Sequence, residues 1–292
     1  MKTTSFNALA MLLFFLVATS SATVSVKETQ DIPYLGKGRK EKLDAYLPIL
    51  SDGQLAPAVV YIHGGGWAIG DKASGKERAI PIALSKEGYA VFSINYHLTR
   101  FAGKKWKSEI KTPGWPQNIY DCKSAVRYVR KNAAKYKIDP NRIAVMGSSA
   151  GGHLALLTAL SYENQKLNDG ALYTDVSCRV KCVISLCGIP DIRIWGGDAF
   201  MGSDPKANAQ EWALASPVTH LSEKSPPIML IHGDKDLTVD VSLSTKFAEM
   251  LAQKKHPHKL IIVKNAGHNL QLKSKANDLT PNVVKFLDKH TK

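Results

Sequence analysis

Beyond residue 22 the sequence has no apolar run long enough to span a bilayer, which takes about 20 residues. It also has no low-complexity stretch, no internal repeat and no change of composition that would mark a linker between domains. These absences exclude a polytopic membrane protein, a repeat protein and a long disordered chain. Because 44% of the residues are hydrophobic and 22% are charged, the composition favours one ordinary globular domain.

Cysteine is scarce as well. No two of the four cysteines have the C-x-x-C spacing of a metal site, and the sequence implies neither a metal nor an organic cofactor. Four cysteines allow three complete disulfide pairings, among which the sequence does not choose. Free, buried cysteines are the alternative, since two of them fall within apolar segments. The four are Cys122, Cys178, Cys182 and Cys187.

The N-terminus has the pattern of an export signal. Lys2 supplies a positive charge, Ala8 to Ala18 is an unbroken apolar run, and Ser20-Ser21-Ala22 offers small residues for cleavage. The apolar run is too short for a bilayer span, although an N-terminal anchor or a buried strand would share it. We therefore expect a signal peptide over residues 1–22, no stable membrane insertion after its cleavage, and a secreted or periplasmic domain over residues 23–292.

Positive charge is in excess. The formal net charge is +14, and clusters such as Lys104-Lys105 and Lys254-Lys255 are spread along the chain. No aromatic residues are interleaved with them as in a nucleic-acid motif, so we expect no nucleic-acid partner. Most of these charges are expected on a solvated face. An anionic substrate, such as a polysaccharide that carries uronic acids, is the alternative that long-range attraction would favour.

Six short apolar runs predict buried strands. They show no alternation of polar and apolar residues, which is typical of a parallel sheet covered on both faces. Two earlier segments, near Val24–Lys27 and Leu43–Leu47, would add edge strands. The six runs are Ala58–Ile62, Ala90–Asn95, Ile143–Met146, Val183–Leu186, Ile228–Ile231 and Leu260–Val263.

Helical periodicity appears between the runs. Apolar residues recur at three- and four-residue steps from Ile119 to Ala133, and Asp139-Pro140 is expected to stop that helix. Similar stripes follow Leu243 and Val283. The alternation predicts an α/β fold with a mostly parallel central sheet and helices on both faces. Two long stretches, residues 99–116 and 190–226, are rich in Gly, Pro and Trp and predict a small cap over one end of the sheet.

The pattern Gly147-Ser148-Ser149-Ala150-Gly151 is the strongest local signal. A G-x-S-x-G match is weak by itself, but here a strand precedes it and a helix-forming run, His153–Leu160, follows it. That is the setting of a nucleophile elbow, a tight turn that exposes a reactive serine above the sheet. Ser149 is the predicted nucleophile, at a helix N-terminus whose dipole favours negative charge.

A glycine-rich segment, His63-Gly64-Gly65-Gly66-Trp67, follows the strand that ends at Ile62. Consecutive glycines let main-chain N–H groups turn toward one point, as an oxyanion requires. We assign the oxyanion hole to the N–H groups of Gly65, Gly66 and Ala150. A phosphate-binding loop is disfavoured, because the Lys-Ser/Thr ending of that motif is missing.

Serine needs a neighbouring base to become a nucleophile. Among the nine histidines, His268 lies just past the last apolar run, where a loop would carry it to the carboxyl edge of the sheet. His256 and His258 precede that run and are expected at its far end, and His153 is expected to face the core. The sequence therefore favours His268 as the base. Its place after Ser149 also fits the chain order serine, acid, histidine that accompanies a nucleophile elbow.

The base in turn needs an acid that fixes its tautomer and stabilises its charged form. Asp236 follows the strand that ends at Ile231 and is the predicted acid. Asp234 is the near alternative, and Asp191, after the preceding strand, is a weaker one.

These motifs together resemble the esterase and lipase families of the α/β-hydrolase fold that carry an HGGGW oxyanion loop. The sequence is most similar to the branch that contains bifunctional acetylxylan and feruloyl esterases. The similarity extends from Leu43-Asp44-Ala45-Tyr46-Leu47-Pro48 to Ala215-Ser216-Pro217 and beyond. In that family the acid follows a His-Gly-x-x-Asp-x-x-Val pattern, which His232, Gly233, Asp236 and Val239 fulfil. This similarity favours Asp236 over Asp234.

The residues and the resemblance together predict a secreted serine carboxylesterase that cleaves short-chain or aromatic acyl esters. Acetyl and feruloyl groups on plant polysaccharides are the expected substrates, and four tryptophans of the long loops are candidates for stacking on sugars. An arylformamidase-like amidase, a lipase and a non-catalytic binding protein of the same fold are the alternatives. The acyl group, the alcohol and the oligomeric state are not specified by the sequence. The four tryptophans are Trp106, Trp115, Trp195 and Trp212.

Overall fold

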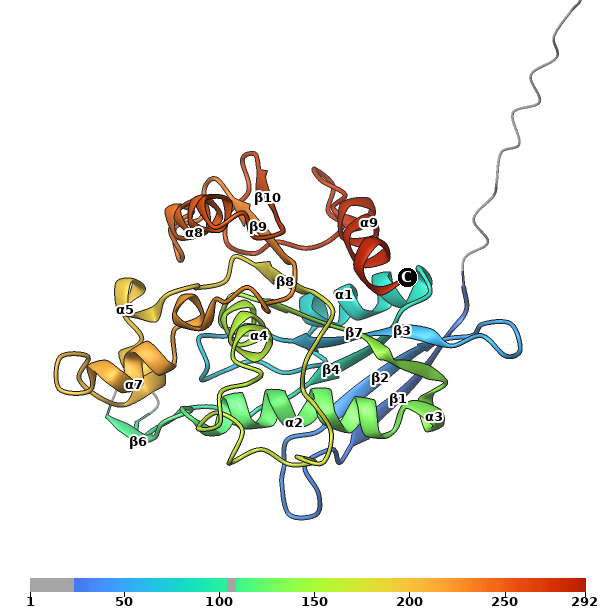
Figure 1. The fold of residues 1–292 in the computed structure, drawn as a ribbon, viewed down its shortest axis with the longest axis horizontal. Helices are drawn as coiled ribbons and strands as arrows, with labels where there is room; N and C mark the ends of the chain where they lie inside the picture. Colours follow the sequence, from blue (N-terminus) through green and yellow to red (C-terminus); the bar gives the residue numbers. More distant parts are fainter. Residues whose placement is uncertain (1–23, 104–108) are drawn as a thin grey trace, which may run out of the picture.

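The computed structural model describes residues 24–103 and 109–292 of the 292-residue chain (Figure 1). An eight-stranded sheet forms its centre, with antiparallel pairing of the first three strands and parallel pairing of the rest. The predicted α/β fold with a mostly parallel sheet is confirmed. In spatial order the strands are β1 (Val26–Ile32), β2 (Leu43–Pro48), β4 (Ala90–Ile94), β3 (Ala56–Ile62), β7 (Ile138–Ser148), β8 (Val183–Leu186), β9 (Ile228–Gly233) and β10 (His258–Val263).

The central strands are apolar on both faces because both faces are covered. Every residue of β3 and of β4 is buried, whereas most of the edge strand β1 is exposed. Five of the six continuous apolar runs therefore correspond to buried inner strands, as expected. The sixth, Leu260–Val263, lies in the edge strand β10, most of which is only partly buried, so the prediction of a buried strand is wrong there. The predicted signal peptide, residues 1–22, lies outside the described residues.

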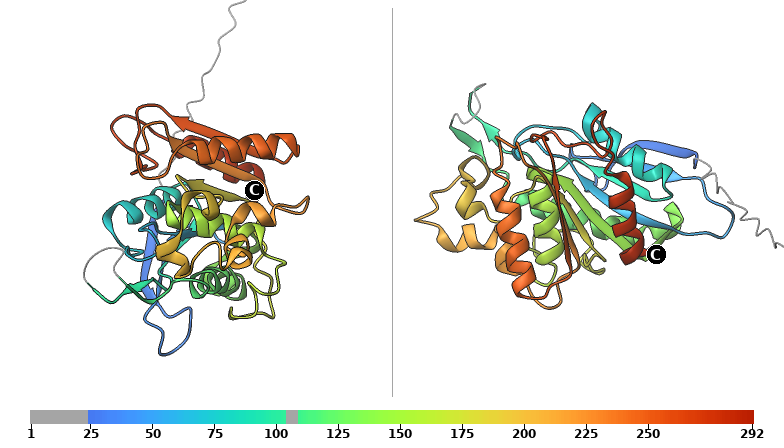
Figure 2. Two further views of the ribbon diagram at one scale, coloured as in Figure 1. Left: turned by 90° about the vertical axis from the view of Figure 1, so that its left-hand side faces the viewer. Right: turned by 90° about the horizontal axis from the view of Figure 1, so that it is seen from above.

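Helices cover the two faces of the sheet (Figures 1 and 2). On one face α2 (Gln117–Lys131), α4 (Ala150–Leu160) and α8 (Ser242–Gln253) pack into the larger apolar core cluster. On the other face α1 (Gly75–Lys86) and α9 (Thr280–Thr291) pack into the second cluster. Within the two described ranges, no helix combines the length and the apolar character needed to cross a membrane.

The helix predicted from the apolar stripe between Ile119 and Ala133 ends earlier than expected. α2 ends at Lys131 and the short α3 (Ala133–Tyr136) ends at Lys137, which adopts a left-handed backbone with φ of 51°. Asp139-Pro140 does not stop a helix but lies within β7, so that part of the prediction is wrong. The ladder between β3 and β7 is irregular at this point, and a proline without an N–H group is tolerated there.

The two long connections form the predicted cap. The first carries the small ribbon β5 (Arg100–Phe101) and β6 (Ile110–Thr112), and the two connections meet where Trp115 Nε1 donates to Glu211 Oε2 at 3.1 Å. The rings of Trp67 and Phe200 stack at 4.7 Å and join the cap to the glycine loop. The second connection carries α5 (Ile192–Trp195), α6 (Asp198–Met201), α7 (Ala209–Leu214) and η1 (Pro217–His220).

The four cysteines are all free and buried. Of the two alternatives left by the sequence, the structure has the one without disulfides. Burial raises the pKa of Cys182 well above that of a free thiol, which keeps this thiol protonated and unreactive.

His153 in α4 joins the glycine loop to the cap. Its side chain is fully buried, accepts from Trp67 Nε1 at 3.1 Å and donates from Nε2 to the Ala215 carbonyl at 2.8 Å. Burial lowers the pKa of His153 to about 4, from an ordinary value of 6.5, so this histidine is neutral in the folded protein. It faces the core, as the sequence analysis expected.

This burial predicts a loss of stability in mild acid. Above pH 6.5 both states hold His153 neutral, whereas between pH 6.5 and about 4 only the unfolded state binds its proton. The free energy of unfolding should therefore fall by about 3 kcal/mol across that window on account of His153. Denaturant unfolding from pH 7 to 4 should show a shallower loss in His153→Gln. Equal slopes in the two proteins would contradict the assignment.

Candidate active site

The parallel strands bring four segments to one edge of the sheet. The glycine loop follows β3, Ser149 follows β7, Asp236 follows β9 and His268 follows β10. Because parallel strands end at the same edge, segments far apart in the sequence converge there. All of the residues that the sequence singled out for chemistry follow the carboxyl ends of strands.

Ser149 lies on a strained turn. Its φ of 53° and ψ of −121° are sparsely populated for a residue with a side chain, and its N–H donates to the Leu186 carbonyl at 2.7 Å. The flanking glycines are required by close approach: a Cβ on Gly147 would lie 2.2 Å from the Gly151 carbonyl oxygen. A Cβ on Gly151 would lie 2.1 Å from the carbonyl oxygen of Ile62. The G-x-S-x-G pattern thus forms the predicted elbow.

Ser149, His268 and Asp236 form one hydrogen-bonded chain. Ser149 Oγ lies 2.8 Å from His268 Nε2, and His268 Nδ1 lies 2.7 Å from Asp236 Oδ2. Since the carboxylate can only accept, Nδ1 carries the imidazole proton and Nε2 accepts from the serine hydroxyl. The structure brings together the three residues that the sequence predicted, in the arrangement needed to activate a serine.

Asp236 is held by several donors. Its side chain is inaccessible to solvent, and Oδ1 accepts from the N–H groups of Thr238 and Val239, both at 2.9 Å. Burial alone would raise the pKa of Asp236, but the hydrogen bonds from Val239, His268 and Thr238 outweigh it and hold this pKa below its ordinary value. The carboxyl is therefore ionised, as a partner of His268 needs to be.

The alternative acids have other partners. Asp234 Oδ1 accepts from the N–H of Asn265 at 2.7 Å and so braces the turn before His268. Asp191 begins α5 by accepting from the N–H of Arg193 and pairs with the guanidinium of the same residue. Neither hydrogen-bonds to His268, which leaves Asp236 as the carboxylate in the chain.

The glycine loop presents free donors beside the elbow. Gly65 and Gly66 adopt φ of 113° and 56°, and the Gly65 carbonyl accepts from the N–H groups of Ala68 and Ile69. In the described part of the chain, the N–H groups of Gly65, Gly66 and Ala150 donate to no backbone or side-chain acceptor. All three residues line the same chamber as Ser149. Unpaired N–H groups beside the serine match the predicted oxyanion hole.

The chamber in front of Ser149 has a volume of about 440 Å³ and walls that are mostly apolar. Among the described residues that line it, Lys76 is the one whose side chain carries a full positive charge. Of the tryptophans expected to meet sugars, Trp195 is half-buried and lines the chamber, and Trp106 lies outside the described residues. Trp115 and Trp212 are buried in the cap, so the prediction is wrong for these two. The apolar walls come from Trp67, Ile69, Ile189, Trp195 and Val239.

Several polar residues near the Ser149–His268–Asp236 hydrogen-bonded chain had no role predicted from the sequence. Glu77 of α1 is buried, accepts from Tyr61 at 2.5 Å and from Ser148, and lines a small hollow beside Ser149 and His268. Cys187 and His232 each place a ligand atom within 4.8 Å of an Asp236 oxygen, and among the described residues these three are a group whose ligand atoms lie close enough together to hold a metal ion. A metal there would compete with His268 for Asp236.

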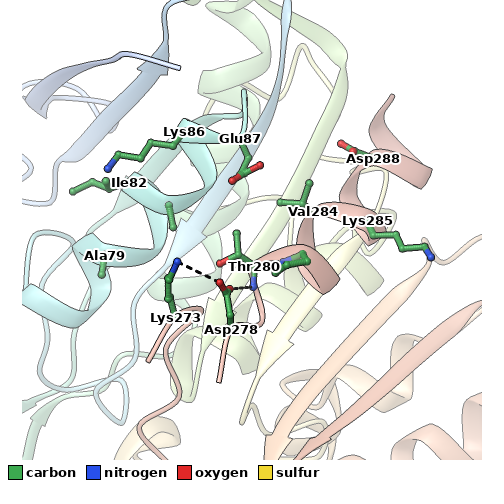
Figure 3. A pocket seen from close by; sticks show the side chains of 12 residues that line it. Ala79, Ile82, Lys86, Glu87, Lys273, Asp278, Thr280, Val284, Lys285 and Asp288 are labelled. Carbon is green, nitrogen blue, oxygen red and sulfur yellow. Dashed lines mark hydrogen bonds and ion pairs between the residues drawn. The ribbon is translucent and has the colours of Figure 1, made fainter. Parts of the chain in front are cut away.

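A larger hollow lies elsewhere. It measures about 1010 Å³ and lies between α1, α9 and the segment that precedes α9 (Figure 3). Lys273 pairs with Asp278 across its floor at 3.4 Å, and its lining mixes charges of both signs. Neither Ser149 nor His268 lines it, so its size does not make it the candidate site.

The eight-stranded sheet, its flanking helices and the Ser-His-Asp chain at its carboxyl edge define a serine hydrolase site on an α/β-hydrolase fold. A model of the family described as BD-FAE matches residues 43–251, and the chain therefore belongs to the BD-FAE family of α/β-hydrolase esterases.

Several of the similar proteins are named as esterases or ester hydrolases. The probable carboxylic ester hydrolase LipM of Mycobacterium tuberculosis is 31% identical over 76% of this chain and 51% of its own length. This chain spans about half the length of the first curated relatives it matches. An acetyl ester-xyloside bifunctional hydrolase from Caldicellulosiruptor lactoaceticus is 28% identical, with a TM-score of 0.69 over 85% of this chain and 88% of that one. A bifunctional GH43-CE protein of Bacteroides eggerthii is 27% identical, with a TM-score of 0.76 over 91% of this chain and 38% of that one.

Proposed function

We propose that the protein is a serine carboxylesterase that hydrolyses short-chain or aromatic acyl esters through an acyl-Ser149 intermediate. The hydrogen-bonded chain from Ser149 to Asp236 is the observation that carries this proposal. It supplies a nucleophile, a base and an acid in contact, beside free N–H donors and an apolar chamber. The mechanism needs no metal and no organic cofactor.

In acylation, Ser149 Oγ attacks the ester carbonyl carbon while His268 Nε2 takes the hydroxyl proton. The carbonyl electron pair moves to oxygen, where the N–H groups of Gly65, Gly66 and Ala150 stabilise the negative charge. Collapse of this intermediate breaks the bond to the alcohol oxygen, which receives the proton from His268. The alcohol leaves, and the acyl group remains on Ser149.

In deacylation, water repeats the attack. His268 takes a proton from the water as its oxygen adds to the acyl carbon, and the same N–H groups stabilise the second oxyanion. The bond to Ser149 Oγ then breaks, and the proton returns from His268 to the serine. Asp236 stays ionised throughout and stabilises the imidazolium that forms twice in each cycle.

We propose acetyl and feruloyl esters of plant polysaccharides as the substrates. The chamber of about 440 Å³ has apolar walls that suit a methyl group or an aromatic ring, and Trp195 offers an aromatic face. The similar Caldicellulosiruptor protein, an acetyl ester-xyloside bifunctional hydrolase, supports the acetyl part. The excess of positive charge supports a polymer that carries anionic sugars.

Acetate and ferulate release from acetylated xylan, pectin and feruloylated arabinoxylan tests this proposal. Release that vanishes in Ser149→Ala is the expected result. Hydrolysis of p-nitrophenyl acetate without release from any polymer would leave the esterase and remove the polysaccharide substrates.

Gly65→Ala tests the oxyanion hole. A Cβ on Gly65 would lie 2.0 Å from the Ile69 carbonyl oxygen, and its φ of 113° is costly for alanine, so the loop must move. We expect kcat to fall about 10²- to 10³-fold, as after loss of one oxyanion donor. Gly53→Ala, which meets nothing within 4 Å at a φ of 81°, is the matched control for a strained glycine and should keep its kcat. An unchanged kcat in Gly65→Ala would remove this loop from the mechanism.

We also propose export of the protein, on the sequence of residues 1–22. N-terminal sequencing of protein produced in a secreting host should give a mature chain that begins near Thr23. Retention of Met1 on protein found inside the cell would contradict this proposal.

A further inference from the structure

A second histidine contacts the acid of the candidate site. His232 in β9 is fully buried, and its Nε2 lies 3.1 Å from Asp236 Oδ2 and 2.9 Å from the Val239 carbonyl oxygen. Its other ring nitrogen, Nδ1, lies 2.7 Å from Ser244 Oγ in α8. The same carboxylate oxygen, Oδ2, lies 2.7 Å from His268 Nδ1. Asp236 Oδ2 is therefore placed between two imidazoles.

These contacts fix the tautomer of His232. A carbonyl oxygen can only accept a hydrogen bond, and the ionised carboxylate is likewise an acceptor, so Nε2 carries a proton shared between the two. Burial lowers the pKa of His232, which keeps the ring neutral and leaves Nδ1 as an acceptor for the Ser244 hydroxyl. His232 is thus a neutral donor aimed at the catalytic carboxylate.

We propose that His232 is a positioning residue for the esterase reaction: its Nε2–H holds the Asp236 carboxylate in the orientation in which Oδ2 accepts from His268. This inference rests on the proposed function. Two backbone N–H groups already hold Oδ1, and His232 is an imidazole donor that shares Oδ2 with His268. By taking part of the negative charge on Oδ2, it also moderates the pull of Asp236 on the His268 proton.

Other titratable groups around this pair come from two further elements. Cys187 follows β8 and hydrogen-bonds to Asp236, and burial raises the pKa of this thiol to about 12, so it remains protonated. On α1, Lys76 and Glu77 line the small hollow beside His268. None of these is altered by substitution of His232, so a change in the pH profile can be attributed to the lost donor.

A pair of substitutions separates the donor from the packing. His232→Leu removes the donor, whereas His232→Gln keeps an amide N–H close to the position of Nε2. With p-nitrophenyl acetate we expect His232→Leu to lower kcat about 10- to 100-fold, the factor that one hydrogen bond to a charged group is worth, at an unchanged KM. The acid limb of its kcat/KM profile should move to higher pH, because Asp236 now stabilises the imidazolium more strongly. His232→Gln should restore most of kcat and the original acid limb.

His256→Leu is the matched control. His256 is also buried and donates from Nε2 to a carbonyl oxygen, that of Pro226 at 3.0 Å, but Pro226 precedes β9 and lies at the opposite sheet edge from Asp236. This substitution should lower the melting temperature and leave kcat and the acid limb unchanged. If His232→Leu and His232→Gln lose kcat equally, with the acid limb of the wild type, His232 acts through packing alone and the inference is wrong.

A measurement without substrate keeps this test apart from that of the proposed function. In the wild-type protein the proton between His268 Nδ1 and Asp236 should give a low-field NMR signal. We expect this signal to move further downfield in His232→Leu, where Oδ2 no longer shares a second imidazole donor, and to stay in place in His256→Leu. An unmoved signal in His232→Leu would overturn the positioning role. Failure of the wild type to hydrolyse any ester would instead overturn the proposed function.

Discussion

Ser149→Ala is expected to lower kcat/KM for p-nitrophenyl acetate about 10⁵-fold or more, to the rate set by binding and the oxyanion hole alone. No other hydroxyl can replace Oγ, because Ser149 alone lies on the strained turn that directs its side chain to His268 at 2.8 Å. Stability should not fall, since removal of the hydroxyl leaves no buried group without a partner.

Ser148→Ala is the matched control for this substitution. Ser148 is the neighbouring serine, but its hydroxyl donates to Glu77 and not to His268. Its removal should change kcat/KM by less than about tenfold, the value of one hydrogen bond. Comparable losses in the two variants would show that the turn, and not the nucleophile, had been disturbed.

Asp236→Asn is expected to lower kcat about 10⁴-fold at neutral pH, as loss of the carboxylate does in a serine protease triad. The amide can donate to His268 Nδ1, which would leave the imidazole proton on Nε2. That nitrogen then no longer accepts from Ser149, and no negative charge stabilises the imidazolium. The KM should change little, because Asp236 is inaccessible to solvent and does not line the chamber.

The neighbouring aspartate provides the control for Asp236→Asn. Asp234→Asn changes the same chemical group two residues away, in the turn that accepts from the N–H of Asn265. Its effect should be confined to stability, with kcat within a fewfold of the wild type. A large loss of kcat in Asp234→Asn alongside a small loss in Asp236→Asn would reverse the assignment of the acid.

The inner strands could be predicted because burial on both faces requires a continuous run of apolar residues, which is visible in the sequence. Every residue of β3 and β4 is buried, and five of the six predicted runs lie within or overlap inner strands, whereas the sixth, Leu260–Val263, lies in the partly buried edge strand β10. The positions of Ser149 and His268 followed from the strand ends, because parallel strands carry the residues that follow them to one edge. Local sequence patterns were thus sufficient to predict the fold class and the positions of Ser149 and His268 at the carboxyl edge of the sheet.

Other features depend on contacts between distant residues. α1 has Pro81 in its interior and buries Glu77 and Ser85, so its apolar stripe is interrupted. These polar side chains are paired with Tyr61 and with the Tyr46 carbonyl, which lie 16 and 39 residues away in the sequence. This helix could not be predicted from local sequence, since the partners that permit burial of its polar side chains are distant in the sequence.

The role of His232 could not be predicted from the sequence for a related reason. The residue appeared only as a member of the His-Gly-x-x-Asp-x-x-Val pattern, whose spacing does not say which nitrogen meets which oxygen. The tautomer became clear from two acceptors at one ring nitrogen, Val239 and Asp236. Likewise, the burial of Trp115 and Trp212 follows from cap contacts that composition does not reveal.

Reaction of the folded protein with a fluorophosphonate, followed by peptide mass spectrometry, identifies the nucleophile. The probe phosphonylates a serine only where a base activates it and donors stabilise the resulting oxyanion. We expect one adduct, on the peptide that contains Ser149, and its loss in His268→Ala. An adduct on another residue, or no adduct on protein shown to be folded, would contradict Ser149 as the nucleophile.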